Sequence, residues 1–456
     1  MVGNLPTSAS FLVTEDCNLS CKYCYELKKH NKSKMSYDVI HKGLEYLCNN
    51  AKISNKDNNF HVMIFGGEPF LCPDIVEEIC EYGYKLQQKN NIKFTATVIT
   101  NGTQMNDHIF YILTNYKNKI GLTCQLSIDG NEEAHDLYRV TKNGDGSFRF
   151  IQRNIDRFKL AYKDAPWMLN VHGCINKKTL PLLYDSYIFF KEQWEMEKIW
   201  FMPIHEENWD MDDVDLYQQQ LNKICDYMIN KCKESQSLDE IRVYTPINKC
   251  FYPYKKSMRP CGAGNGFITI VHNGDIYPCH MFYFNDDFQK YLIGNVFDSI
   301  DENNSIRKKF INITEDNMTC DKDCKNTNCY RCMGSNWLKN GSPTQQIKGV
   351  YCAMSSVEKS ITDRMKKEIA NLDFVDLNDK MWMKKEREWV ENGQIHELYI
   401  NSVGEEVDFV TELNKEQQYQ VKEYYNLEAF NIIARSQKMV LQELQDIKMK
   451  LGGDIG

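Results

Sequence analysis

The sequence predicts an α/β fold, in which a partial βα barrel is followed by a cysteine-rich domain and a helical extension. Three observations support this prediction. The chain has 456 residues, too many for one small core. Up to about residue 205, its apolar residues alternate between strand and helix periodicity. Eight of its 18 cysteines fall between residues 250 and 352.

The first segment carries six short apolar stretches separated by five amphipathic ones. The predicted strands are 10–14, 60–65, 93–99, 121–128, 168–174 and 198–204, and the predicted helices are 36–50, 73–89, 106–116, 149–163 and 179–195. Strands that alternate with helices form parallel sheets with right-handed crossovers. Six strands fit an open, partial (βα)6 TIM-like barrel better than a closed eight-stranded one, and they place the functional site at the carboxyl ends of the strands.

Four domains follow from these patterns. We expect the barrel at 1–205, a linker and bridging helix at 206–249, a cysteine-rich domain at 250–355 and a helical extension at 356–456. The linker is the acidic run 206–215, and a helix follows near 214–233. Residues 416–451 carry an amphipathic stripe. The extension could bind substrate, dimerise or cover the cysteine-rich domain.

Composition excludes several classes of protein. The net charge of −8 offers no basic surface for nucleic acid. No apolar run is long enough to span a membrane, and the N-terminus does not resemble a signal peptide. We therefore expect a cytoplasmic protein, in which grouped thiols bind metal rather than form disulfides. The seven scattered cysteines are interpreted as small buried hydrophobes: Cys48, Cys72, Cys80, Cys124, Cys174, Cys225 and Cys232.

The first cysteine group directly follows the first predicted strand. Cys17, Cys21 and Cys24 are spaced C-x3-C-x2-C. Three thiolates on one loop can hold three irons of a [4Fe–4S] cluster and leave the fourth iron open for chemistry. A zinc site could use the same thiolates, but it would need a fourth ligand that is not obvious nearby.

This loop resembles the signature of radical S-adenosylmethionine (SAM) enzymes, with the aromatic residue Tyr23 before the last cysteine. The resemblance continues after later strands in Gly66-Gly67-Glu68-Pro69, Thr100-Asn101-Gly102, Ser127-Ile128-Asp129-Gly130 and His135-Asp136-x2-Arg139. It implies that SAM is bound by Tyr23, Gly66, Gly67, Glu68, Asn101, Ser127, Asp129 and Arg139. Glu68 would pair with an ammonium group, and Ser127 and Asp129 would bind ribose hydroxyls.

The second cysteine group resembles a SPASM domain, which holds two auxiliary [4Fe–4S] clusters in peptide-modifying radical SAM enzymes. The resemblance implies that Cys261, Cys279 and Cys332 hold the nearer cluster and that Cys320, Cys324, Cys329 and Cys352 hold the outer one. With the first cluster, this makes three. Cys250 either completes the nearer cluster or leaves it an open iron for a substrate thiolate. The alternative is a zinc ribbon built from 320–332.

Within this branch the sequence is similar to maturases of ribosomal peptides that form Cys thioethers. Anaerobic sulfatase maturases carry an Asp base after the cysteine that matches Cys279, and here that residue is His280. His280 could serve as a base or support the cluster through hydrogen bonding. The expected partners are a precursor peptide and a reductant such as flavodoxin or ferredoxin. The alternatives are a formylglycine-generating sulfatase maturase and a non-catalytic iron–sulfur or zinc-binding protein.

Overall fold

The computed structural model describes residues 5–24, 33–54, 58–204, 207–242, 261–300, 304–311, 313, 332–345 and 347–375, together with three strands between 385 and 408. The chain divides into two compact units, and the three strands between 385 and 408 lie in the second. Each unit is described by itself. No helix in the described residues is long and apolar enough to cross a membrane.

Six parallel strands form the barrel sheet in chain order. They are β1 (Ser8–Leu12), β2 (Asn59–Phe65), β3 (Lys93–Thr100), β4 (Thr123–Ser127), β5 (Leu169–Ile175) and β6 (Lys198–Pro203). Each strand pairs in parallel with the next along the chain. The predicted partial barrel is therefore confirmed, and each strand lies within two residues of its expected start and end.

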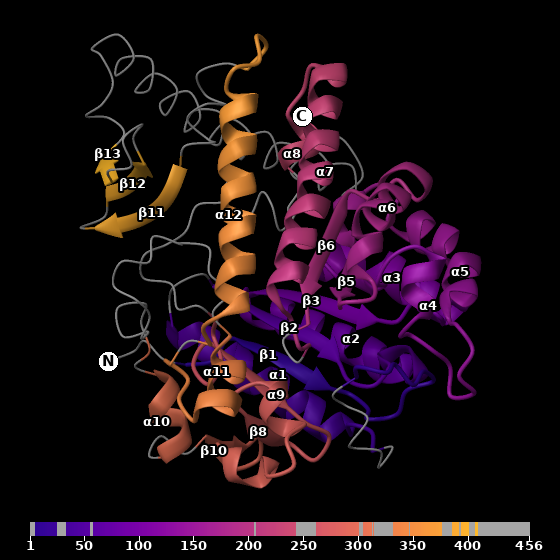
Figure 1. Cartoon of the computed structure of the whole chain (residues 1–456). Coiled ribbons are helices and arrows are strands. Elements are labelled where there is room, and N and C mark those ends of the chain that lie inside the picture. Colours follow the sequence, from indigo (N-terminus) through magenta and orange to yellow (C-terminus); the bar gives the residue numbers. More distant parts are fainter. Residues whose placement is uncertain are drawn as a thin grey trace, which may run out of the picture. The chain divides into compact units, whose positions relative to one another are not determined.

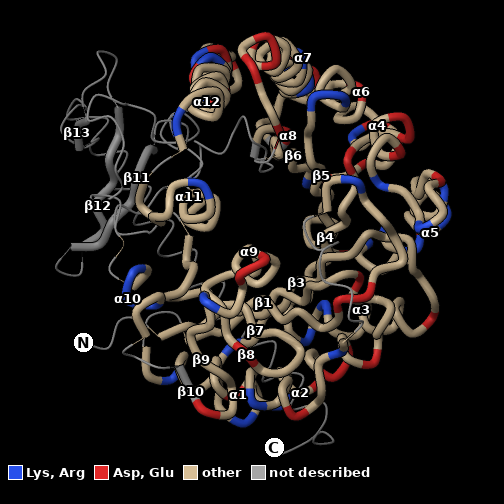
Figure 2. The backbone as a smooth tube through the Cα atoms, turned by 60° about the horizontal axis from the view of Figure 1, so that its bottom comes forward, with Lys and Arg blue, Asp and Glu red and all other residues tan. Residues whose placement is uncertain are grey.

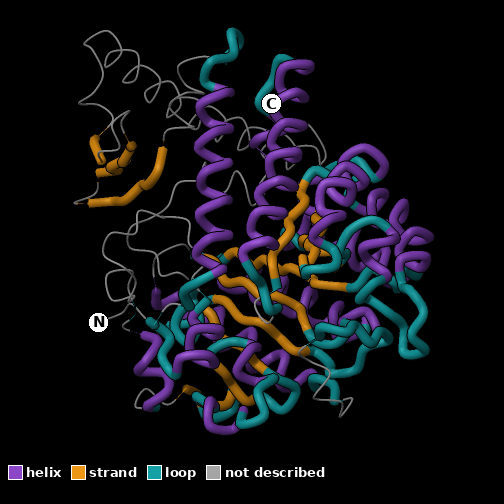
Figure 3. Tube along the Cα trace, in the orientation of Figure 1, coloured by secondary structure: helices purple, strands orange, loops and turns teal. Residues whose placement is uncertain are grey.

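Helices cover the outside of this sheet (Figures 1 and 3). They are α1 (Tyr37–Ser54), α2 (Pro73–Asn90), α3 (Asp107–Ile120), α4 (Glu132–Asp136), α5 (Phe148–Ala161) and α6 (Leu183–Ile188). In β3 the buried residues alternate with half-buried ones, so that one face packs on the helices and the other faces the barrel interior. Residues of both charges lie on the outer helices (Figure 2).

The cysteine-rich segment extends the same sheet. β7 (Phe267–Ile270) pairs in parallel with β1, and β8 (Asp275–Tyr277), β9 (Gly294–Asn295) and β10 (Ser299–Ile300) follow as antiparallel neighbours. The short helices α9 (His280–Tyr283), α10 (Ser305–Ile311) and α11 (Met333–Asn340) pack around a second aromatic core. Because β7 lies beside β1, this segment reaches the carboxyl ends of the barrel strands.

Two long helices lie side by side in the first unit, α7 (Met211–Ser235) and α12 (Val350–Ile369). The short helix α8 (Asp239–Arg242) follows α7. The prediction of a linker over the acidic run 206–215 is partly wrong, because α7 already begins at Met211. Asp210 and Asp213 form a reciprocal capping box there, and carboxylates at a helix N-terminus are stabilised by the helix dipole.

The second unit contains a three-stranded antiparallel sheet. Its strands are β11 (Lys385–Glu391), β12 (Gln394–Ile400) and β13 (Glu406–Asp408). The expectation of helix over 356–456 is wrong for these strands, where aromatic and β-branched residues flank an Asn-Gly dipeptide typical of hairpins. The amphipathic stripe at 416–451 lies outside the described residues.

Candidate active site

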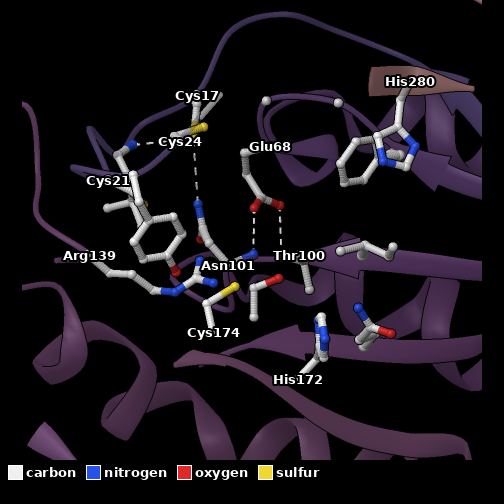
Figure 4. Close-up of a pocket in the computed structure, with 18 of the residues that line it drawn as sticks. Cys17, Cys21, Cys24, Glu68, Thr100, Asn101, Arg139, His172, Cys174 and His280 are labelled. Carbon is white, nitrogen blue, oxygen red and sulfur yellow. Dashed lines mark hydrogen bonds between the residues drawn. The ribbon is translucent and has the colours of Figure 1, made fainter. Parts of the chain in front are cut away.

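The loop that carries the first three cysteines is fixed by backbone hydrogen bonds. Cys24 N donates to Cys21 O at 3.0 Å and closes a tight turn, while Lys22 N donates to Tyr138 O at 2.9 Å. Cys21 is buried, and Cys17 and Cys24 are half-buried. Burial raises the pKa of the Cys17 and Cys21 thiols. Figure 4 shows the three cysteines at one side of a cavity.

Two glycines let the end of β2 pack against this loop. Gly67 N donates to Thr14 O at 2.8 Å, and Glu68 N donates to Asp16 O at 2.9 Å. A Cβ atom on Gly67 would lie 2.2 Å from Asp16 O, and Gly66 has a φ of +136°. Larger residues would separate the two segments. The glycines therefore place Glu68 beside Cys17.

The Glu68 carboxylate is buried and accepts three hydrogen bonds. Oε1 accepts from Phe70 N at 3.0 Å and Thr100 Oγ1 at 2.7 Å, and Oε2 accepts from Asn101 N at 2.7 Å. Burial raises its pKa to about 7. A carboxylate held this firmly at a cavity wall can pair with a ligand's ammonium group.

Asn101 connects the third strand to the cysteine loop. Its Nδ2 donates to Asn18 Oδ1 at 2.9 Å and lies 3.9 Å from Cys17 Sγ. Leu19 N also donates to Cys17 Sγ, at 3.4 Å. N–H groups directed at a sulfur stabilise it as a thiolate or a cluster ligand.

Asp129 lies at the centre of a buried polar network. It accepts hydrogen bonds from Tyr23 Oη at 2.5 Å and from Cys174 N at 2.9 Å. Arg139 Nε lies 3.0 Å from Asp129 Oδ1. Both carboxylate oxygens are therefore engaged by the protein itself, whereas Ser127, at the end of β4, lines the cavity.

The His-Asp pair of the last motif supports the segment that carries Arg139. His135 is fully buried and lies 2.9 Å from Ser147 Oγ through Nε2. Asp136 Oδ1 accepts from Phe148 N at 2.8 Å at the start of α5. These two residues thus fix the loop after α4 rather than face the cavity.

Three cysteines of the second group are brought together. Burial raises the pKa of the Cys279 thiol, and the nearby thiols of Cys332 and Cys261 raise it further. Cys352 lies in the first turn of α12 and is half-buried. Four further predicted ligands lie outside the described residues: Cys250, Cys320, Cys324 and Cys329.

The arrangement of the first three cysteines fits a cluster site. In the described parts of the chain, no group of three or more His, Cys, Asp or Glu side chains is arranged for one metal ion. The thiols that ligate a [4Fe–4S] cluster each bind a different iron, so they lie farther apart than the ligands of a single metal ion. Cys17, Cys21 and Cys24 share one loop with N–H donors near the Cys17 sulfur, so these residues fit a cluster with one open iron.

One cavity of about 410 Å³ joins the two cysteine groups. Its walls include the first three cysteines, Glu68, Asn101 and Arg139, and also His280, Met281 and Cys332. His280 lies across the cavity from the cysteine loop (Figure 4) with its ring 5.2 Å from that of Phe65. Burial lowers the pKa of His280 to about 4, which keeps its imidazole neutral near pH 7.

The cavity also contains residues that the sequence analysis missed. His172 and Cys174 line it from β5, and burial lowers the pKa of His172 to about 4 and raises that of Cys174 to about 12. The interpretation of Cys174 as a core residue is therefore wrong, while those of the other six scattered cysteines are confirmed. The alternation of β5 could have identified them, because His172 and Cys174 lie on one face of the strand and the core residues Val171 and Ile175 lie on the other.

Comparisons with known proteins identify the family of the barrel and several relatives of the chain. The Radical SAM superfamily model matches residues 11–175. The cysteine-type anaerobic sulfatase-maturating enzyme of Clostridium novyi is 26% identical over 348 residues, which cover 72% of this chain and 87% of that protein. The subtilosin biosynthesis protein AlbA of Bacillus subtilis is 26% identical over 312 residues, covering 64% of this chain and 58% of AlbA.

The fold also matches a solved structure. The structure of native anSMEcpe with bound AdoMet superposes with a TM-score of 0.62 at 20% identity, covering 80% of this chain and 100% of that one. The family match, the cysteine loop at the end of β1 and the shared fold agree. The barrel, over residues 11–175, is therefore a radical SAM domain.

Proposed function

We propose that this chain is a radical SAM peptide maturase that crosslinks a ribosomal precursor peptide oxidatively, through a thioether formed by a Cys of that peptide. The names of its relatives support a peptide or protein substrate. AlbA takes part in the biosynthesis of the bacteriocin subtilosin, and the clostridial relatives mature sulfatases. The related fold also holds a peptide, in anSMEcpe with bound Cp18Cys peptide.

The family implies SAM and one [4Fe–4S] cluster. With one electron from an external reductant such as flavodoxin or ferredoxin, these cofactors would supply a 5′-deoxyadenosyl radical that removes a hydrogen atom from the substrate. In our proposal, Cys17, Cys21 and Cys24 hold the cluster and Glu68 holds the methionyl ammonium group. Gly66 and Gly67 let the backbone approach SAM closely, and Tyr23, Asn101, Ser127, Asp129 and Arg139 complete its site.

The single cavity shared by both cysteine groups carries the proposal. Joining a C–H carbon to a thiol sulfur removes two hydrogens, so after the first hydrogen atom the substrate must lose a further electron and the proton of its thiol. In our proposal, Cys261, Cys279 and Cys332 hold an auxiliary cluster that receives it, and Cys320, Cys324, Cys329 and Cys352 hold another. Cys332 lines the cavity itself, and a substrate bound there would lie between the two groups.

His280 favours crosslinking over sulfatase maturation. It occupies the position where, by resemblance, sulfatase maturases carry an Asp base, and it lines the cavity. Its ring packs near Phe65, next to the paired glycines. A different group at this position is consistent with a different second step.

Coexpression of the chain with a short Cys-rich candidate precursor tests the proposal. We expect a loss of about two mass units per crosslink, with the Cys thiol blocked from alkylation, and no loss with Cys24→Ala. A peptide that stays unmodified while SAM is cleaved to 5′-deoxyadenosine would contradict the proposed substrate class but leave the radical chemistry standing.

Sulfatase maturation is the second candidate, because the Clostridium novyi sulfatase maturase aligns with this chain over 87% of its own length. A peptide with a sulfatase-type Cys or Ser distinguishes the two. Formation of formylglycine, detected by its reaction with a hydrazine, would establish this alternative. The crosslinking proposal predicts no aldehyde.

A further inference from the structure

Arg139 is held in the active site by Asp129 and by the ring of Tyr23. Its side chain is only 10% exposed, and its Nε lies 3.0 Å from Asp129 Oδ1. The guanidinium carbon lies 5.5 Å from the centre of the Tyr23 ring. Its direction is therefore fixed by the protein before any ligand binds.

The same guanidinium lies beside the cysteine loop. Arg139 lines one cavity with Cys21 and Cys24, and the Tyr23 ring that it contacts comes from the residue between these two cysteines. Lys22 N also donates to the backbone oxygen of Tyr138, the residue before Arg139. Cys21 and Asp129 are both buried. Charges act strongly over short distances where water is excluded.

Stability does not explain the pair. Asp129 already accepts hydrogen bonds from Tyr23 and from Cys174 N, one on each oxygen. A buried ion pair contributes little net stability, because both charges lose their hydration. A role in the chemistry of the cysteine loop accounts for the place of Arg139 in the wall of the same cavity.

We propose that Arg139 and Asp129 together set the reduction potential of the cluster held by Cys17, Cys21 and Cys24. Arg139 raises the potential, and Asp129 limits that rise. A reduced cluster carries one more negative charge, which a cation and N–H donors at its sulfurs stabilise. The inference depends on the assignment of the cluster to these cysteines and is separate from a role in binding SAM.

The test is a redox titration of the anaerobically reconstituted full-length protein without SAM, followed by electron paramagnetic resonance. The signal of this cluster is identified by its loss in Cys24→Ala. In Arg139→Gln, we expect the ratio of reduced to oxidised cluster at a fixed potential to fall about tenfold, which is about 59 mV for one electron. In Asp129→Asn we expect the ratio of reduced to oxidised cluster at the same potential to rise. Arg149→Gln, an exposed arginine on α5, should not change it.

The opposite signs distinguish this role from a structural one. Loss of packing would disturb the cluster similarly in both variants, so shifts in one direction, or no shift, would overturn the inference. If Arg139→Gln does not bind the cluster, the reduction potential of Asp129→Asn is the test. An unchanged or lower potential in Asp129→Asn than in the wild type overturns the proposal. If the wild-type protein binds no iron at Cys17, Cys21 and Cys24, the cluster assignment itself fails.

Discussion

The carboxylate of Glu68 shows how a functional residue costs the folded protein stability. Burial raises its pKa to about 7 from the ordinary 4.5. The folded state therefore binds its proton more tightly than the unfolded state, and the stability of the cofactor-free protein falls as the pH rises from about 4.5 to about 7. This difference corresponds to about 3 kcal/mol.

Glu68→Gln should remove this dependence. At pH 8 we expect the free energy of unfolding of the cofactor-free variant to be up to about 3 kcal/mol higher than that of the wild type, because Gln resembles the protonated acid. SAM binding, measured by calorimetry on the reconstituted protein, should be lost. Glu133→Gln, an exposed residue of α4, is the control. Equal stabilities of wild type and Glu68→Gln at pH 8 would contradict the prediction.

At the residue scale, sequence motifs identify positions more reliably than roles. Glu68 lies at the cavity wall, where its motif predicts it. Asp129, interpreted as a ribose ligand, already accepts from Tyr23 and the backbone of Cys174. That network joins the cysteine loop, β4 and β5, and no local spacing encodes it.

At the scale of elements, the close contact between the end of β2 and the cysteine loop should tolerate no side chain. We expect Gly67→Ala to lower the iron content of the reconstituted protein by about one cluster, because its Cβ would lie 2.2 Å from Asp16 O. Gly266→Ala is the matched control, since no atom lies within 4 Å of its added Cβ. Iron analysis compares the two, and equal iron in Gly67→Ala and wild type would show that the loop can move aside.

The α7–α12 pair offers a test of stability. Tyr217 Oη donates to Glu358 Oε1 at 2.9 Å within the interface, and both residues are buried. We expect Tyr217→Phe to lower the free energy of unfolding by about 1–3 kcal/mol, because a buried acceptor loses a donor. Denaturant unfolding measures it. Tyr37→Phe, at an exposed site on α1, should change it little, and equal losses in both variants would argue against the interface.

The barrel elements were predictable because local signals and tertiary environment agree there. In β3 the alternation of apolar residues in the sequence matches the alternation of burial. The pairing of β7 with β1 could not be read from either strand, since it joins residues far apart in the chain. The acidic residues at the start of α7 are typical of a linker, so the helix start is predicted correctly only if the capping box at Asp210 and Asp213 is recognised.

At the scale of the whole molecule, the sheet explains why two cysteine groups serve one cavity. β7 continues the barrel sheet beside β1, the strand that leads into the cysteine loop. The turn after β8 then places Cys279 and His280 near the carboxyl ends of the barrel strands. Cys332, at the N-terminus of α11, lines the same cavity. Spacing predicts two groups, but only the sheet order predicts that they face each other.

Cys250 determines how the nearer auxiliary cluster can act. It lies outside the described residues, and we expect it to be the fourth ligand after Cys261, Cys279 and Cys332. A cluster with four thiolates has no open iron. The resonance signal of the auxiliary clusters in the wild-type protein, separated from that of the first cluster by comparison with Cys24→Ala, should then not change when a thiol such as 2-mercaptoethanol is added after reconstitution.

Cys250→Ala should open that iron. We expect the variant to keep its iron and to show a thiol-dependent change in the resonance spectrum of the reduced auxiliary cluster, because an external thiolate can occupy the vacated position. Cys232→Ala, a buried cysteine of α7, controls for loss of a thiol elsewhere. If the spectra of wild type and Cys250→Ala both change on addition of the thiol, Cys250 is not a ligand, and the nearer cluster can bind the substrate's own cysteine directly. If neither spectrum changes, Cys250 is not a ligand either.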